Sequence, residues 1–202
     1  MVVARLAEGL WRWTERHHEW TPGQDWEPDV GSVYCEAFGD VLLIDPLLPG
    51  DGDERERFWR ALDRDVTRAA GPLHILLTCA WHARSSAEIG ARYPGAATRI
   101  AKPGAALPGK VTAVEAVPGE EVVLWLPSHD ALVTGDVLLG DDEGGLRLCP
   151  DSWLGGRDPE SVRTGLAGRL APLDVERVLV SHGAPVLSGA RAALDRALRT
   201  GP

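Results

Sequence analysis

Side chains that can bind a metal ion or carry charge gather in one short stretch of the chain, residues 76–88, which reads LLTCAWHARSSAE. Cys79 and His82 are candidate metal ligands, because thiolate and neutral imidazole are donors that zinc accepts. Arg84 adds a permanent positive charge. An apolar run precedes these residues and a helix-start pattern follows them. The stretch therefore indicates a strand-to-helix turn that is either a metal site, a former metal site or an ordinary turn.

Three more polar residues follow other apolar runs. Asp45 ends the run that starts at residue 41, Asp136 follows the run that starts at residue 131, and His182 follows the run that starts at residue 177. A strand fixes such a residue in place, and the loop that follows leaves its side chain accessible. Each residue alone is also ordinary turn chemistry. Their shared position at strand ends predicts one candidate site.

Hydrophobic periodicity predicts the elements that position these residues. Two β-rich runs split at Gly39 and Asp40 predict a hairpin. Apolar residues at helical spacing predict a helix over 53–70 that stops at Gly71 and Pro72. The continuous apolar run 73–78 predicts a strand buried on both faces.

The second half of the chain alternates strands with two helices. Ser85 and Glu88 form a capping-box pattern, which predicts a helix that ends before Pro94. Asp158, followed by Pro and Glu, predicts the start of another helix. The other patterns predict strands at 98–102, 111–117, 121–127, 131–136 and 176–181, a loop over 140–157, and a last helix over 188–201. Mixed sheets covered by helices are the economical packing for this order.

Composition indicates one soluble globular domain. Of 202 residues, 44% are hydrophobic and 25% are charged, which is ordinary for a folded domain. We expect a single domain over residues 28–202, preceded by a Trp-rich extension, residues 1–27, that packs on the body. Four of the eight Trp residues lie in that extension: Trp11, Trp13, Trp20 and Trp26.

Charge and cysteine content exclude several classes of partner. The chain has 30 acidic and 21 basic residues, a net charge of -9, which argues against nucleic acid and anionic membranes as partners. Three Cys residues without a CxxC pattern favour a reducing compartment. The first residues do not resemble a signal peptide, and no apolar window has the length of a membrane span. We therefore expect a cytoplasmic protein and leave its oligomeric state open.

The order of these landmarks resembles the metallo-β-lactamase superfamily. The landmarks are LID at 43–45, LLT at 76–78, TGD at 134–136 and SHG at 181–183. The resemblance implies an αββα sandwich of two mixed sheets. It also implies a site at one edge where one or two zinc or iron ions activate a water molecule for hydrolysis. In this family Asp45 braces the turn that follows Thr78.

The chain departs from the family at its metal ligands. Aligned on Thr78, the family motif His-x-His-x-Asp-His falls on Cys79, Trp81, Ala83 and Arg84. Of these four residues, only Cys79 can bind zinc. The lone His of the middle region is also missing, where the chain offers Glu115, Glu120 and Glu121. The resemblance leaves Asp136 and His182 as the family ligands that this chain keeps.

Three interpretations of the site follow. In the first, Asp136, His182 and either His82 or Cys79 hold a single zinc, iron or manganese ion, and a bulge aims His82, which is one residue out of register. In the second, no metal binds, and Arg84 pairs with Asp136 in the pocket. That pair binds an anionic small molecule, or His182 acts there as acid or base. In the third, the site is inert.

These interpretations predict a hydrolase-like protein with a degenerate metal site, mononuclear or metal-free. The alternative is a non-catalytic protein that binds a small ligand or a partner on the same scaffold. A redox role for Cys79 is a further possibility, because Arg84 and a helix N-terminus would depress its pKa. The substrate class is not determined by the fold.

Overall fold

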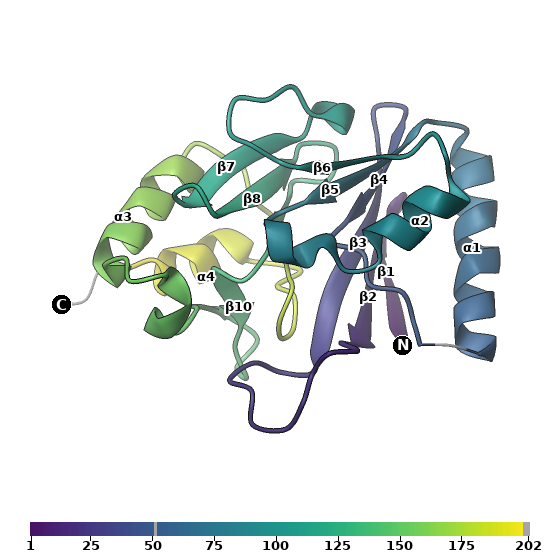
Figure 1. Cartoon of the computed structure of the whole chain (residues 1–202). Coiled ribbons are helices and arrows are strands. Elements are labelled where there is room, and N and C mark those ends of the chain that lie inside the picture. The colour runs from purple at the N-terminus through teal and green to yellow at the C-terminus, as the bar shows by residue number, and fades with distance from the viewer. Residues whose placement is uncertain (51, 200–202) are drawn as a thin grey trace.

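The computed structural model describes residues 1–50 and 52–199. Two β-sheets pack face to face, and helices cover both outer faces (Figure 1). Helices α1 and α2 lie on the outer face of the first sheet, and α3 and α4 lie on the outer face of the second. This arrangement confirms the predicted αββα sandwich. The helices are α1 (Asp53–Ala69), α2 (Ser86–Arg92), α3 (Pro159–Leu170) and α4 (Ala190–Ala197).

The first sheet has six strands in sequence order. They are β1 (Val2–Ala7), β2 (Leu10–Arg16), β3 (Asp29–Ala37), β4 (Asp40–Ile44), β5 (Leu73–Leu77) and β6 (Ala97–Ile100). Strands β1 to β4 are antiparallel, whereas β4, β5 and β6 are parallel. The predicted hairpin is β3–β4. The Trp-rich N-terminal segment supplies β1 and β2, of which β2 pairs with β3, and so extends this sheet.

The second sheet has four strands in the order β12-β9-β8-β7. They are β7 (Thr112–Val117), β8 (Glu121–Leu126), β9 (Ala131–Thr134) and β12 (Arg177–Val180). Strands β12 and β9 are parallel, and the other pairs are antiparallel. As a result, the carboxyl ends of β9 and β12 meet at one edge, as those of β4 and β5 do in the first sheet.

The loop predicted over 140–157 is partly wrong. Strands β10 (Leu138–Gly140) and β11 (Leu146–Leu148) form a two-stranded sheet, and a 3-10 helix, η3 (Asp151–Leu154), follows. Leu146 and Leu148 are buried while Arg147 between them is exposed. Three residues of alternation are too short a signal to distinguish a strand from a polar loop.

The predicted helix starts were right in position, but one cap was wrong. Asp158 caps α3 as predicted, because its Oδ2 accepts a hydrogen bond from Ser161 N–H at 2.9 Å. The capping box before α2 does not form. The Ser85 hydroxyl accepts a hydrogen bond from Leu48 N–H at 2.9 Å, and Glu88 pairs with Arg55 of α1. Tertiary partners therefore take both side chains away from the local cap.

The last helix ends earlier than predicted. It runs over Ala190–Ala197, and the part of the prediction at 200–201 lies outside the described residues. Within the described part of the chain, no helix combines the length and apolar character needed to cross a bilayer.

The core between the two sheets holds the strand ends together. Leu42 and Ile44 from β4 pack with Leu124 and Val133 of the second sheet, and all four are buried. Isolated bridges between Val30 and His182 and between Cys79 and Glu121 join the two sheets at this edge. The edge is where the predicted site residues lie.

Candidate functional site

Asp45 lies at the end of β4 and binds the start of the turn that follows β5. Its Oδ1 accepts a hydrogen bond from Thr78 N–H at 2.9 Å, and its Oδ2 accepts one from the Thr78 hydroxyl at 2.6 Å. The Asp45 backbone has a φ of 47°, a conformation that costs a non-glycine residue roughly 1–3 kcal/mol. The two hydrogen bonds hold this conformation and fix the direction of the turn.

The turn is a four-residue 3-10 helix, η1 (Ala80–Ala83), that begins after Cys79. Its tight winding turns adjacent side chains in different directions. His82 is 3% exposed and faces the site, whereas Trp81 is 52% exposed. A short 3-10 turn, which departs from helical geometry at His82 itself (φ -82°, ψ 16°), places this side chain inward where a bulge was expected to do so.

His82 lies between two carboxylates. Its Nδ1 is 2.9 Å from Oδ2 of Asp45, and its Nε2 is 3.2 Å from Oδ1 of Asp136. Burial and the charge of Arg84 lower the pKa of His82, but the two carboxylates outweigh them and raise it well above its ordinary value. Without another cation, the two carboxylates therefore favour the charged form of the imidazole.

Asp136 follows β9 and receives contacts from three side chains. Its Oδ1 is 3.4 Å from Nε2 of His182, which follows β12. Its Oδ2 accepts a hydrogen bond from Trp81 Nε1–H at 2.7 Å. Burial raises the pKa of Asp136, but close contacts with His182 and His82 and the hydrogen bond from Trp81 hold it far below its usual range. The carboxylate is therefore charged at neutral pH.

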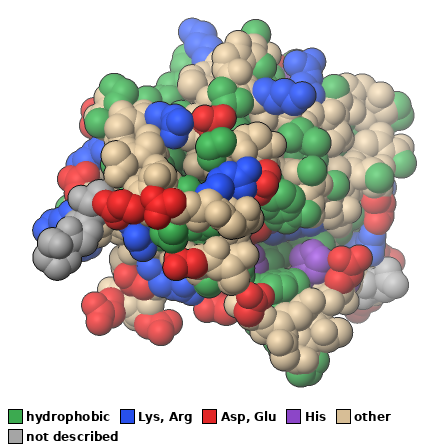
Figure 2. All heavy atoms as spheres, turned by 60° about the vertical axis from the view of Figure 1, so that its left-hand side comes forward, with side chains coloured by type: hydrophobic (Ala, Val, Ile, Leu, Met, Phe, Trp, Pro, Cys, Tyr) green, Lys and Arg blue, Asp and Glu red, His purple; other side chains and the backbone are tan. Residues whose placement is uncertain are grey.

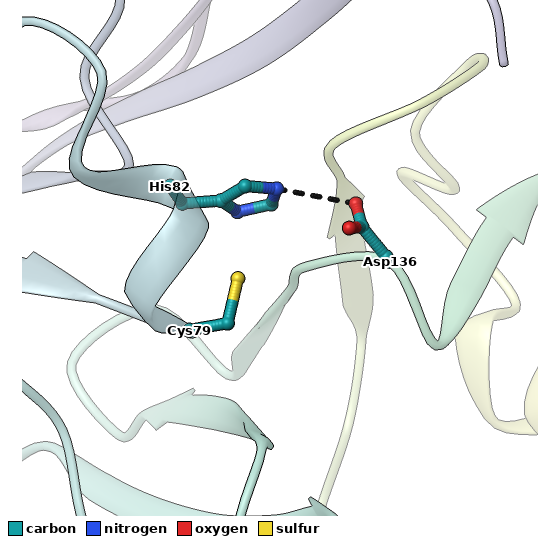
Figure 3. A group of neighbouring side chains, drawn as sticks. All are labelled: Cys79, His82 and Asp136. Carbon is teal, nitrogen blue, oxygen red and sulfur yellow. Dashed lines mark ion pairs between the residues drawn. The ribbon is translucent and has the colours of Figure 1, made fainter. Parts of the chain in front are cut away.

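Cys79, His82 and Asp136 form the candidate metal group of the site, with one ligand atom of each lying within 4.8 Å of the others. Figure 3 shows the His82 ring and the Asp136 carboxylate facing each other, with the Cys79 thiol pointing toward them. Burial raises the pKa of Cys79. The depressed pKa expected for a redox role is therefore wrong, because burial outweighs the nearby charges.

Arg84 does not pair with Asp136, contrary to the prediction. One guanidinium nitrogen donates to the carbonyl oxygens of Gly31 and Asp45, at 3.0 and 2.9 Å, and the other donates to the Ser181 hydroxyl at 2.8 Å. No ion pair joins Arg84 to Asp136 among the described residues. The guanidinium of Arg84 is therefore hydrogen-bonded to two carbonyl oxygens and one hydroxyl, and the sequence does not reveal that these groups lie beside it.

Glu121 is a site residue that was not predicted; it was named only as one of the Glu residues in the region where the family has a lone His. It begins β8 and is buried beside Asp136, where its Oε1 accepts hydrogen bonds from the N–H groups of Asp136 and Val137 at 2.9 and 3.0 Å. Burial, with the charge of Asp136, raises the pKa of Glu121 to about 8. An acidic residue at the start of an otherwise apolar strand was the available signal.

The absence of a side chain at Gly135 allows Thr78 and Glu121 to approach the backbone beside Asp136 closely. A Cβ atom on Gly135 would lie 2.7 Å from the Thr78 hydroxyl and 2.9 Å from Glu121 Oε1, so only glycine fits there.

Arg12 of β2 donates to the carbonyl oxygens of Val180 and Gly183, both at 3.0 Å. Arg12 thus fixes the turn that carries His182, a role that no sequence motif indicated.

The site opens into a cavity of about 390 Å³. Figure 2 shows histidine side chains at the floor of a hollow, with hydrophobic and acidic side chains around it. The walls include Trp26, Trp81 and Trp153, of which Trp26 and Trp153 were not predicted at the site. The cavity has the size of a small-molecule site, which is about 300–1,000 Å³.

Comparison with known proteins supports the fold. No protein-family model and no curated protein match the sequence. The chain is similar to the crystal structure of DIM-1 metallo-β-lactamase, with a TM-score of 0.65 and 14% identity over 98% of this chain and 94% of that chain. It is also similar to a metallo-β-lactamase from Erythrobacter litoralis, with a TM-score of 0.59 and 17% identity over 97% and 89% of the two chains.

A third similar structure is the metallo-β-lactamase FIM-1 from Pseudomonas aeruginosa in its mono-zinc form. Its TM-score is 0.59, with 14% identity over 98% of this chain and 96% of that chain. These similarities extend over nearly the whole chain. The chain therefore has the metallo-β-lactamase fold, as the ordered landmarks of the sequence predicted.

Proposed function

We propose that this chain is a hydrolase-like protein of the metallo-β-lactamase fold that holds a single divalent metal ion between His82, Asp136 and His182. The observation that carries the proposal is the convergence of two imidazole nitrogens on one carboxylate oxygen. Nε2 of His82 and Nε2 of His182 lie 3.2 and 3.4 Å from Oδ1 of Asp136. Two imidazoles and a carboxylate are the ligand types of catalytic zinc sites.

The surroundings of these three residues fit a bound cation. Oδ1 of Asp136 is buried and accepts no hydrogen bond in a suitable geometry. Nδ1 of His82 faces the Asp45 carboxylate, which favours the tautomer that leaves Nε2 free to bind an ion. Histidines that bind metals commonly donate their other N–H to a carboxylate in this way. The Cys79 thiol lies within 4.8 Å of ligand atoms of His82 and Asp136 and would be a further ligand.

Trp81 and Arg84, which stand at two ligand positions of the family motif, favour a site with one ion. Trp81 donates its N–H to Oδ2 of Asp136 and so occupies the second oxygen of that carboxylate. Arg84 places its guanidinium against the backbone at the end of β4, where a second cation would be repelled. When bound, one divalent ion would supply a water molecule of lowered pKa for hydrolysis. Asp45, Thr78 and Arg12 would keep the ligands in position.

A second candidate function is supported by His82 itself. An imidazolium between Asp45 and Asp136 would satisfy both carboxylates without a metal ion, and its raised pKa makes this state accessible at neutral pH. In that case the chain would be a non-catalytic protein that binds a small ligand in the cavity. The two candidates differ in whether the cation at the site is a proton or a metal ion.

Elemental analysis of protein purified without a metal-binding tag distinguishes them. We expect about one zinc, iron or manganese ion per chain, lost in His82→Ala, Asp136→Ala and His182→Ala. His129→Ala is the matched control, because His129 contacts the backbone of Glu36 away from the site. A wild-type protein that stays metal-free after incubation with each ion would exclude the metal proposal and favour the second candidate. Two ions per chain would contradict the single-ion arrangement.

A further inference from the structure

The mouth of the cavity is built from indole rings around His182. The ring centroids of Trp26 and Trp153 lie 5.7 and 5.9 Å from that of His182, in edge-on geometry. Trp81 lines the cavity as well. Trp26 belongs to the segment 17–28 between β2 and β3, which extends below the sheets (Figure 1), and Trp153 belongs to η3. Two segments far apart in sequence therefore bring their indole rings to one opening.

The polar edges of two of these rings are already used. Trp153 Nε1–H donates to Oδ2 of Asp25 at 2.8 Å, and Trp81 Nε1–H donates to Oδ2 of Asp136 at 2.7 Å. The surface that these rings can offer to a ligand is therefore their π-faces. The face of an indole ring carries negative electrostatic potential and attracts cations, most strongly of the aromatic side chains.

The charges at the mouth have the same sign as the ring faces. Glu19, Asp25 and Glu120 line the cavity. Glu120 pairs with Arg157 at 2.8 Å, but within residues 1–50 and 52–199 no ion pair compensates Glu19 or Asp25. Burial lowers the pKa of His17, so His17 adds no positive charge there at neutral pH. An anionic ligand would meet two uncompensated carboxylates at the entrance.

Arg84 does not reverse this preference. Although it lines the cavity, both of its terminal guanidinium nitrogens donate to oxygen atoms of Gly31, Asp45 and Ser181. Its Nε is buried and has no hydrogen-bond partner among the described residues, so Arg84 keeps one donor inside the site and away from solvent. The anionic ligand that the sequence suggested depended on a pair between Arg84 and Asp136, and no such pair forms among the described residues.

We propose that the mouth of this cavity binds an organic cation, a methylated ammonium group, held against the faces of Trp26 and Trp153 and by the carboxylates of Glu19 and Asp25. This inference deepens the proposed function, because it names the ligand class of the same pocket, but the binding step itself needs no metal ion. A quaternary, fully methylated ammonium such as that of choline has no N–H group to donate, so it suits a site made of ring faces and charge. Methylated ammonium ligands are recognised by aromatic cages of this kind.

The test compares ligands of equal shape and different charge. Choline, its neutral carbon isostere 3,3-dimethylbutan-1-ol and the anion 3,3-dimethylbutanoate are titrated into the full chain by calorimetry, with and without EDTA. We expect choline to bind at least about tenfold more tightly than either of the other two. Equal affinities, a preference for the anion, or no measurable choline binding would overturn the inference.

Variants locate the binding in the mouth. Asp25→Asn keeps an oxygen that can accept the Trp153 N–H and removes only the charge, and Trp153→Leu removes a ring face. We expect each to weaken choline binding at least about fivefold. The matched controls are Glu143→Gln in an exposed turn and Trp59→Leu on α1, where Arg92 covers the ring. Unchanged binding in both mouth variants, or equal loss in the controls, would contradict the proposal.

Two further arms separate this inference from related ones. Cosedimentation with phosphatidylcholine vesicles distinguishes a free cation from a lipid headgroup, and strong vesicle binding would overturn the small-molecule assignment. Metal content is measured on the same samples. A chain that carries metal without preferring choline loses only this inference, whereas a metal-free chain that binds choline loses only the proposed metal function.

Discussion

Replacing Glu121 with Gln removes a buried titratable group and keeps its hydrogen bonds, because Gln retains the Oε1 acceptor for the N–H groups of Asp136 and Val137. Burial raises the pKa of Glu121 from its ordinary 4.5 to about 8. Between these values the native protein binds a proton that the unfolded chain has lost. The stability contributed by this proton is fully present below pH 4.5 and is lost as the pH rises through about 8.

The magnitude follows from the size of the shift. Each pH unit in this window lowers the free energy of unfolding of the wild type by about 1.4 kcal/mol relative to the variant. The whole window, about 3.5 units, gives an upper limit of about 5 kcal/mol. We expect Glu121→Gln to be more stable than the wild type by about 1–5 kcal/mol near pH 8. The two proteins should converge near pH 4.5, where Glu121 is protonated in the native state.

The assay is urea unfolding across this pH range, with EDTA present so that a bound ion does not contribute. Glu143→Gln is the control, because Glu143 lies in an exposed turn and its substitution should leave the pH dependence of the wild type unchanged. Parallel curves for the wild type and Glu121→Gln would refute the reasoning. They would mean that Glu121 keeps an ordinary pKa, and hence that the floor of the site is better solvated than its burial indicates.

Three other substitutions test the supports of the site. Gly135→Ala should lower the free energy of unfolding by about 1–3 kcal/mol, measured in urea, because its Cβ would lie 2.7 Å from the Thr78 hydroxyl; an unchanged midpoint would show that the contact can relax. Arg12→Met should cost about 2–3 kcal/mol, since it leaves the carbonyls of Val180 and Gly183 without their donor, and a neutral effect would mean that water replaces it. Asp45→Asn should weaken zinc binding about 10–100-fold in competition with a chromophoric chelator, and unchanged affinity would remove Asp45 as the group that orients His82.

The order of most elements along the chain and the residues at several strand ends could be predicted from the sequence, because they depend on local signals. The apolar runs and the Gly-Asp and His-Gly endings placed Asp45, Asp136 and His182 at one edge. Parallel pairing of β4 with β5 and of β9 with β12 then brings their ends together. Apolar runs and the polar residues that end them can be recognised in a single sequence from the spacing of the apolar residues.

The contacts within the site could not be predicted, because they depend on backbone groups. His82 faces inward from the 3-10 turn η1, which is irregular at His82 itself, whereas its spacing from Thr78 alone suggested a bulge. Arg84 was expected to pair with the carboxylate of Asp136, but its guanidinium donates hydrogen bonds to oxygen atoms of three residues of other strands and turns, Gly31, Asp45 and Ser181. Ser85 likewise binds Leu48 N–H and does not cap α2. A sequence shows charges and helix signals but not which backbone oxygens a fold leaves unpaired.

The proposed single-ion site implies that replacing Arg84 or Trp81 alone would not create a two-metal site. Arg84 has a φ of 39°, a conformation costing roughly 1–3 kcal/mol, and its hydrogen bonds to Gly31, Asp45 and Ser181 offset that cost. Histidine at this position could not reach three oxygens, so those groups would lose their donor. Trp81 meanwhile covers Oδ2 of Asp136. Arg84 and Trp81 thus stabilise the geometry that leaves one oxygen of Asp136 facing two histidines, and the proposed single ion would lie between those three groups.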